Sequence, residues 1–346
     1  MKLTYNKFQR PLSTKGVTLV ELMIAVALGL LLTAGAISIF VSSKQIYRTE
    51  DAMSRNQENG RFITDFLARK IRMAGFTGCS NLEELEPVVI ADPAPIGGFS
   101  FDSALIGYEG NGTNKTKTWV NPSTIVRVAG TDIVTIGSGG ECGADLTGNM
   151  DTVNANIQIA GGGGDCGFEA NDYLLLTDCE TADLFRASSV SEASGKITVA
   201  HAENVNTENF LSKTYQAGSG LYHFQQTTYF IGTAPSGNPS LYRILHKDPL
   251  VTQELIENVQ DMQFLYGVDT GVDGVIDVYQ DASDVDDWAR VLGARISLLL
   301  RSDEDNVTMQ PQTITFNGAS VNTGPGADHR LRTVFNSTVT VRNRVP

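Results

Sequence analysis

The sequence predicts an α+β fold in which one long N-terminal helix packs on a globular domain rich in antiparallel β-sheet. The apolar run of residues 17–41 continues into an amphipathic segment, and no proline occurs between Val17 and Phe76. After residue 90 the chain is rich in glycine and breaks into short apolar runs separated by turn residues. A helix followed by many strands is typical of an α+β domain, and 346 residues suffice for a sizeable core.

The apolar run VTLVELMIAVALGLLLTAGAISIFV contains a single charged residue, Glu21. A helix needs about 20 apolar residues to cross the hydrocarbon core of a bilayer, so residues 17–41 are predicted to span a membrane. Residues 1–16 carry four basic residues and no acid, which by the positive-inside rule keeps them in the cytoplasm.

Three interpretations of this N-terminus compete. A secretory signal would end in a small-residue cleavage site after the apolar run and would lose that run. A plain signal anchor explains the length and the basic flank, but not the carboxylate of Glu21 five residues into the run. An ionised group at membrane depth is costly and points to a function by default.

The third interpretation is a resemblance. Lys15-Gly16-Val17-Thr18-Leu19-Val20-Glu21 resembles the class III leader of type IV pilins and type II secretion pseudopilins. The resemblance implies that a prepilin peptidase cuts after Gly16, so that residues 1–16 are a leader peptide and the helix is retained. It also implies N-methylation of Val17, although the family's commonest first mature residue is Phe. Glu21 would then pair with the Val17 amine of its own or a neighbouring subunit and set the assembly register.

After Val41 the pattern becomes amphipathic, and residues 42–76 are predicted to continue the helix to about Ala74. Residues 77–346 are predicted to form a β-rich globular domain on the far side of the membrane. The runs that predict strands are Ile133–Ile136, Tyr173–Thr177, Ile197–Ala200, Thr228–Ile231, Leu241–Leu245, Val259–Gly267, Arg295–Arg301 and Val334–Val341.

Several later segments resemble PilW-type minor pilins: Arg72–Cys79, Leu175–Cys179, Glu257–Val268, Arg295–Arg301 and Arg330–Asn343. The resemblance implies a pilin-like fold and a non-catalytic subunit that takes part in priming type IV pilus assembly near the tip. Its partners would be other minor pilins, the major pilin and a pilus-tip adhesin. It would reside first in the bacterial inner membrane, with a periplasmic domain, and then in the pilus. Residues 97–165 match no segment of the family, and their Gly and Asn content suggests variable loops.

Four cysteines and no CxxC favour disulfides in an exported chain. The alternative is four buried thiols. Cys79 and Cys179 lie in segments that resemble the family, whereas Cys142 and Cys166 lie in or beside the unmatched middle. The resemblance therefore favours the pairs Cys79–Cys179 and Cys142–Cys166 among three connectivities.

An aspartate-rich segment is the best candidate metal site. Asp269, Asp273 and Asp277 occupy positions 1, 5 and 9 of an EF-hand-like loop, and the carbonyl of Val275 would add a ligand. Position 3 is a glycine and position 12 is Gln280, so calcium would bind weakly. The alternative is an Asp/Gly-rich hairpin turn.

The net charge and the sequence motifs make some classes of function unfavourable. The chain carries −13 overall, so the part after the leader carries −17, which disfavours binding to nucleic acid. Four scattered His and the absence of H-E-x-x-H, G-x-S-x-G and Walker motifs argue against an enzyme, and no cofactor is required. Residues 162–167 fit G-x-G-x-x-G, but a loop and a strand are expected after them in place of the helix that binds a phosphate. The alternatives are a minor pseudopilin of a type II secretion system, a pilus-borne adhesin module and an anchored hydrolase.

Overall fold

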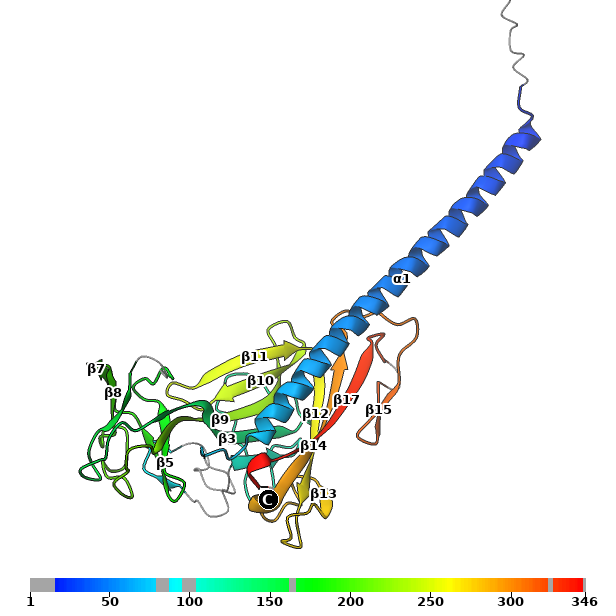
Figure 1. Ribbon diagram of the computed structural model, residues 1–346. Coiled ribbons are helices and arrows are strands. Elements are labelled where there is room, and N and C mark those ends of the chain that lie inside the picture. The colour runs from blue at the N-terminus through cyan, green and yellow to red at the C-terminus, as the bar shows by residue number, and fades with distance from the viewer. Residues whose placement is uncertain (1–15, 79–86, 95–103, 162–165, 323–325, 345–346) are drawn as a thin grey trace, which may run out of the picture. The chain divides into compact units, whose positions relative to one another are not determined.

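The computed structural model describes residues 16–78, 87–94, 104–161, 166–322 and 326–344. The chain divides into two compact units, Met1–Asp51 and Ala52–Pro346. Helix α1 (Leu19–Arg72) begins in the first unit and ends in the second (Figure 1). The predicted long helix is therefore present, and it ends two residues before the expected Ala74.

The larger sheet of the second unit has eight strands: β1 (Val88–Val89), β2 (Leu105–Tyr108), β3 (Ile133–Asp145), β5 (Tyr173–Thr177), β6 (Ala182–Arg186), β9 (Gly220–Thr233), β10 (Pro239–Leu245) and β11 (Val251–Glu257). Their order is β1-β6-β5-β9-β10-β11, and β3 pairs with both β9 and β2. All pairings are antiparallel except that of β1 with β6. The long strand β9 pairs with three other strands and is the centre of this sheet.

A second sheet has the order β13 (Val278–Gln280), β12 (Val259–Val268), β14 (Val291–Arg301) and β17 (Arg332–Thr340). Two smaller sheets complete the unit: β15 (Ile314–Phe316) with β16 (Ala319–Val321), and β4 (Ile157–Ala160), β8 (Lys196–Ala200) and β7 (Ser189–Ala193). Two short 3₁₀ helices are η2 (Trp288–Arg290) and η3 (Arg342–Arg344).

The eight runs predicted as strands all coincide with strands or lie largely within them, and the α+β class is confirmed. The expectation of variable loops over residues 97–165 is wrong for β2, for β4 and for the part of β3 after the predicted Ile133–Ile136. The glycines in that part of β3 are typical of a loop, but here they are needed for packing. A Cβ on Gly143 would lie 2.2 Å from the ring of Tyr222, and one on Gly139 would lie 2.8 Å from the carbonyl oxygen of Phe76.

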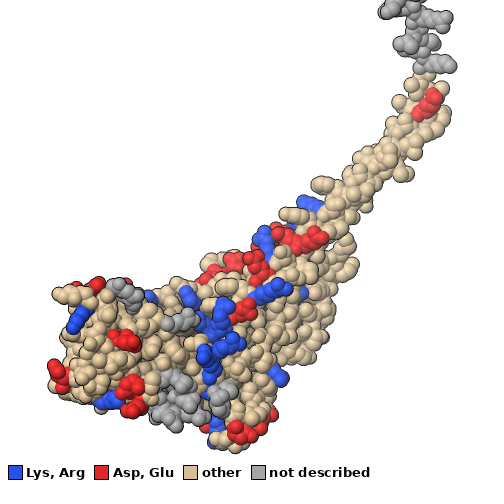
Figure 2. Space-filling model, viewed as in Figure 1, with Lys and Arg blue, Asp and Glu red and all other residues tan. Residues whose placement is uncertain are grey.

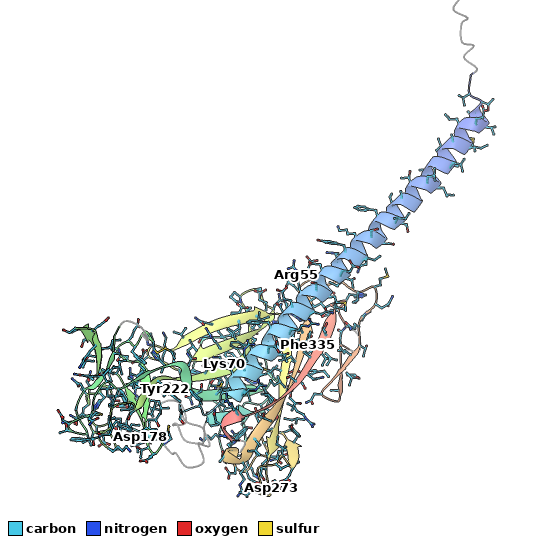
Figure 3. The ribbon with its side chains drawn as sticks, in the orientation of Figure 1. Arg55, Lys70, Asp178, Tyr222, Asp273 and Phe335 are labelled. Atoms are coloured by element: carbon cyan, nitrogen blue, oxygen red, sulfur yellow. A yellow bond between two sulfur atoms is a disulfide. The ribbon has the colours of Figure 1, made fainter. Side chains whose placement is uncertain are left out.

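One stripe of α1 packs into the main core of the second unit (Figures 1 and 3). Its buried residues recur every three or four positions: Asn56, Gly60, Ile63, Leu67 and Ile71. They meet apolar side chains from both large sheets, and Phe66 contacts Tyr229 of β9 edge to face at 5.8 Å between ring centroids. Each fully buried Ile or Leu contributes about 1.5–3 kcal/mol. Met53, expected on this stripe, is half exposed.

A second core is formed by residues of β4 and β8 together with residues of β5, β6 and β9. Residues 207–216 pack over this core. They have no regular secondary structure and are held by hydrogen bonds to a buried carboxylate. Asp183 is fully buried, and its carboxylate accepts hydrogen bonds from the Ser212 amide and hydroxyl and from the Tyr215 hydroxyl, the last at 2.6 Å. Three donors compensate the cost of burying this carboxylate.

Candidate assembly site on the N-terminal helix

The start of α1 is fixed by a capping box. The carbonyl of Thr18 accepts the first intrahelical hydrogen bond, from the Leu22 amide. The Thr18 hydroxyl accepts from the Glu21 amide at 3.2 Å, and the Thr18 amide donates to Glu21 Oε2 at 3.0 Å. This reciprocal pair satisfies two amides that a helix N-terminus leaves without partners. The T-x-x-E pattern carries the signal for it, so the role of Thr18 could have been predicted.

Glu21 uses one of its two carboxylate oxygens in this cap. Oε2 accepts from both the amide and the hydroxyl of Thr18, at 3.0 and 2.9 Å, whereas Oε1 makes no hydrogen bond within the described residues. A carboxylate can accept about four hydrogen bonds. The free oxygen therefore leaves room for a cation next to the residues Gly16 and Val17, which precede the helix.

None of the large apolar side chains that the structure describes in the first unit is buried. From Val17 to Val41 they are exposed, with values such as 72% for Leu32 and 69% for Phe40, and Figure 2 shows a single acidic group on this stretch. Among the described residues, α1 is the one helix long and apolar enough to cross a membrane. An apolar surface of this size requires lipid or protein to cover it. The helix can therefore anchor the chain and also associate with other apolar helices.

The aspartate-rich segment forms a loop between β12 and β13 (Figure 3). Asp269 Oδ1 accepts from the Val272 amide at 2.5 Å, and its Oδ2 accepts from the Gly274 amide at 2.8 Å. Asp277 Oδ2 accepts from the amides of Thr270 and Gly271. These carboxylates thus organise the turn itself.

The Thr270 hydroxyl, which donates to Asp277 at 2.8 Å, holds the pKa of that carboxyl below its usual value. Within the described part of the chain, no three His, Cys, Asp or Glu side chains are placed to hold a metal ion. The contacts favour the hairpin-turn interpretation, and calcium binding stays a prediction.

The three cysteines that the structure describes are oxidised. Cys142 of β3 and Cys166 are joined, with 5.6 Å between their Cα atoms. This is the pair that the family resemblance favours. Cys179 is also disulfide-bonded, and its expected partner Cys79 lies outside the described residues. The alternative of four buried thiols is excluded.

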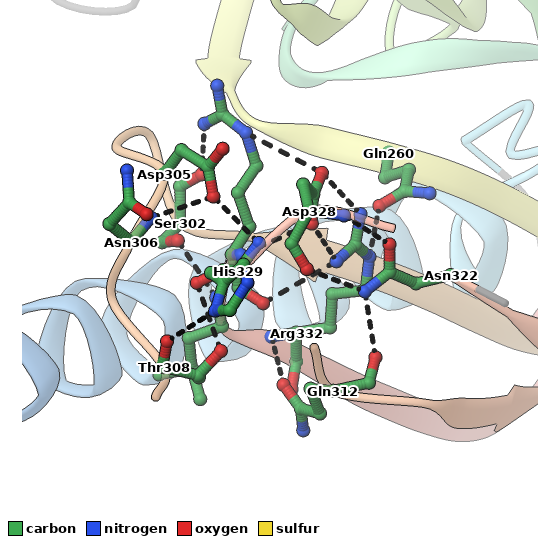
Figure 4. Close-up of polar contacts among 12 residues, drawn as sticks. Gln260, Ser302, Asp305, Asn306, Thr308, Gln312, Asn322, Asp328, His329 and Arg332 are labelled. Carbon is green, nitrogen blue, oxygen red and sulfur yellow. Dashed lines mark hydrogen bonds and ion pairs between the residues drawn. The ribbon is translucent and has the colours of Figure 1, made fainter. Parts of the chain in front are cut away.

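A polar network that the sequence analysis missed joins the C-terminal strand to the helix (Figure 4). The guanidinium of the buried Arg332 makes a bidentate pair with Asp328, at 2.6 and 3.0 Å, and donates to Gln260 at 2.9 Å. Arg332 therefore holds the pKa of Asp328 below its usual value. Next to it, the Leu331 carbonyl accepts from the Asn56 side chain of α1. A lone Arg and Asp four residues apart gave no signal of this role.

A buried carboxyl lies where the two large sheets meet. Asp132 is 3% exposed; its amide donates to the Met262 carbonyl of β12, and its Oδ2 accepts from the Phe264 amide. Oδ1 makes no hydrogen bond in the described structure. Burial is the main cause that raises the pKa of Asp132 to about 8, and the nearby carboxylates of Glu109 and Asp261 contribute in the same direction.

Comparisons with known protein families agree with this geometry. Residues 12–37 match the model of the prokaryotic N-terminal methylation motif, and residues 228–343 match the model of the type IV pilus-assembly protein W. These matches support a PilW-type pilin. The first match contains Gly16, Val17, Thr18 and Glu21, and the second contains the Arg332 network. No curated protein matches the chain.

The two matches cover different parts of the chain. The methylation motif covers the leader and the start of α1, which accords with membrane anchoring and pilus association. The PilW match runs from within β9 to η3 and contains the whole second sheet. Both families are pilus proteins and not enzymes. The second core around β4 and β8 lies outside both matches.

Proposed function

We propose that this chain is a minor pilin that takes part in priming type IV pilus assembly near the tip. A prepilin peptidase cuts it after Gly16, and the new amine of Val17 is N-methylated. Residues 17–41 then anchor it in the inner membrane, residues 42–76 connect the anchor to the body, and residues 77–346 form the periplasmic domain. Its partners are other minor pilins, the major pilin and a tip adhesin.

One observation carries this proposal: Glu21 is the single charge in the exposed apolar stretch 17–41, and within the described residues one of its carboxylate oxygens makes no hydrogen bond, close in sequence to Gly16 and Val17. A carboxylate in an apolar surrounding is stable when a cation pairs with it. The Val17 amine of a neighbouring subunit supplies that cation, and the pair sets the axial register of packed helices.

Mass spectrometry of the mature N-terminus tests the processing step, with Val17 expected as the first residue. Glu21→Ala is expected to leave cleavage intact and to impair pilus assembly. Thr18→Ala is the matched control, because it removes the capping box while keeping the carboxylate. A Glu21→Ala strain with normal piliation would overturn the proposed role of Glu21. An equal loss of piliation in both variants would mean that Glu21 acts only as part of the helix cap.

The second candidate is a minor pseudopilin of a type II secretion system, because that class shares the class III leader. The PilW match over residues 228–343 favours the pilus. A deletion strain separates the two: loss of twitching with normal secretion supports the pilin, and the reverse supports the pseudopilin.

A pilus-borne adhesin module is favoured by one feature, the second core outside the family match. Glycan binding by the purified full-length protein tests it.

Calcium binding at Asp269, Asp273, Val275 and Asp277 is tested by calorimetry. Heat released on titration with millimolar calcium would support the site, and the absence of heat would reject it.

A further inference from the structure

Two surfaces of the second unit have an exposed apolar centre and charges of opposite sign. The helix face consists of Arg61, Phe62, Asp65, Arg69 and Arg72 on the outer side of α1. The loop face consists of Val272, Asp273, Val275 and Asp277 between β12 and β13. In Figure 2, basic side chains gather over the last turns of α1, and acidic ones gather at the end of the body that holds β13.

We propose that two copies of this chain meet head to tail, with the loop face of one on the helix face of the other. This rests on the proposed function as a pilus assembly subunit and names a partner for it. The contact is heterologous, so each copy keeps one face available for a further neighbour.

The helix face has the composition of an interface centre. Phe62 is 50% exposed and stacks on Phe66 at 5.9 Å between ring centroids, which holds its ring in one orientation. Arg61, Arg69 and Arg72 are exposed and make no ion pair within the described residues. Asp65 is the one acid of the face, so its net charge is positive. Aromatic and Arg side chains are enriched in the centres of protein interfaces.

The loop face is rigid, apolar at its centre and acidic around it. Val272 and Val275 are 69% and 59% exposed, and Val272 adopts φ 61°, a strained conformation for a β-branched residue. The carboxylate of Asp269 holds it there through the Val272 amide. The carboxyl groups of Asp269, Asp273 and Asp277 all lie within 4 Å of where a Cβ on Gly271 would be. Such a loop loses little conformational entropy when it binds.

Charge selects the partner. The chain after the leader carries −17, so most of its surface repels another acidic surface, whereas the helix face offers three unpaired guanidinium groups. Guanidinium groups bind carboxylates in a bidentate geometry. The helix face is thus the part of a second copy that the loop face fits.

Disulfide trapping in whole cells tests the contact. Two full-length copies with different tags are expressed together, one with Phe62→Cys and one with Val275→Cys. Because a disulfide needs Cα atoms within about 7 Å, a reducible dimer carrying both tags is expected only if the faces meet. Val126→Cys is the matched control for Val275→Cys, since Val126 is 72% exposed on another loop; with it, no dimer is expected.

A charge substitution on the helix face is the second test of this contact. Arg69→Glu in the copy with Phe62→Cys should reduce the dimer several-fold, and Arg69→Lys should retain it. Absence of the dimer in piliated cells, with both copies at wild-type levels, overturns the contact. The contact is also overturned if the Val275→Cys copy forms a disulfide only with a different protein and not with the Phe62→Cys copy. Piliation of a deletion strain tests the proposed function separately: normal pili there reject that function whatever the trapping result.

Discussion

Gly60 of α1 lies against the ring of Phe335 in β17, so closely that a Cβ at position 60 would come within 2.2 Å of the ring. Figure 3 shows Phe335 beside the helix. The strand and the helix can approach this far because glycine has no side chain. Together with Ile63 one turn away and Leu67 two turns away, this contact sets how closely the second half of α1 approaches the core.

Gly60→Ala should destabilise the protein although alanine favours a helix. Relief of the clash requires Phe335 or the helix to move, which costs about 1–3 kcal/mol, against a propensity gain of about 1 kcal/mol. Thermal unfolding of the full-length protein in detergent measures the net loss. Gly35→Ala is the control, because a Cβ there meets nothing within 4 Å. Phe335→Leu should partly rescue Gly60→Ala; equal melting temperatures for wild type and Gly60→Ala would contradict the account.

Asp132→Asn should flatten the dependence of stability on pH. The folded pKa of Asp132 is raised to about 8 from 3.8, so its contribution to the free energy of unfolding is fully present below pH 4 and is lost as the pH rises to 8. The loss is up to about 1.4 kcal/mol per pH unit. Urea unfolding of both proteins between pH 4 and 8 measures it. Parallel curves would show that Asp132 does not titrate in this window.

Arg332→Leu should destabilise the body by about 3 kcal/mol, because it removes the buried guanidinium that pairs with Asp328 and donates to Gln260. Arg290→Leu is the control: its pair with Asp287 is exposed, and surface pairs contribute less than about 1 kcal/mol. Urea unfolding compares the two. Similar losses would mean that burial of Arg332 does not matter.

Replacing both Cys142 and Cys166 by Ser should cost about 2–4 kcal/mol, since the bond closes a loop with a sequence separation of 24. The remaining bond of Cys179 should persist, and peptide mapping without reductant should find it joined to Cys79. In the wild-type protein, a fragment that links Cys179 to Cys142 or Cys166 would refute both pairings. Thermal unfolding of the double variant measures the cost.

Much of the fold could be predicted because its signals are local. The apolar run and the spacing of Ile63, Leu67 and Ile71 define a helix without reference to anything else in the chain. Strand β5 carries a continuous apolar run, and β12 mixes apolar and polar residues with β-branched and aromatic ones. By contrast, β3 is rich in glycine, and β-propensity depends on the neighbours that a strand packs against. Its partners Phe76 and Tyr222 come from distant parts of the sequence.

The candidate site, like the fold, has some features that local sequence signals predict and others that depend on distant segments. The sequence by itself determined the leader, the anchor and Glu21, because a charge inside an apolar run and a glycine before it are visible in a few consecutive residues. Only the tertiary structure decided that Arg332 meets both Asp328 and Gln260, and that Gly60 lies against Phe335. It also decided that the Asp269 and Asp277 carboxylates hold their own loop. The physical reason is that hydrogen bonds and close packing depend on side-chain distances, which distant segments acquire only when the sheets assemble.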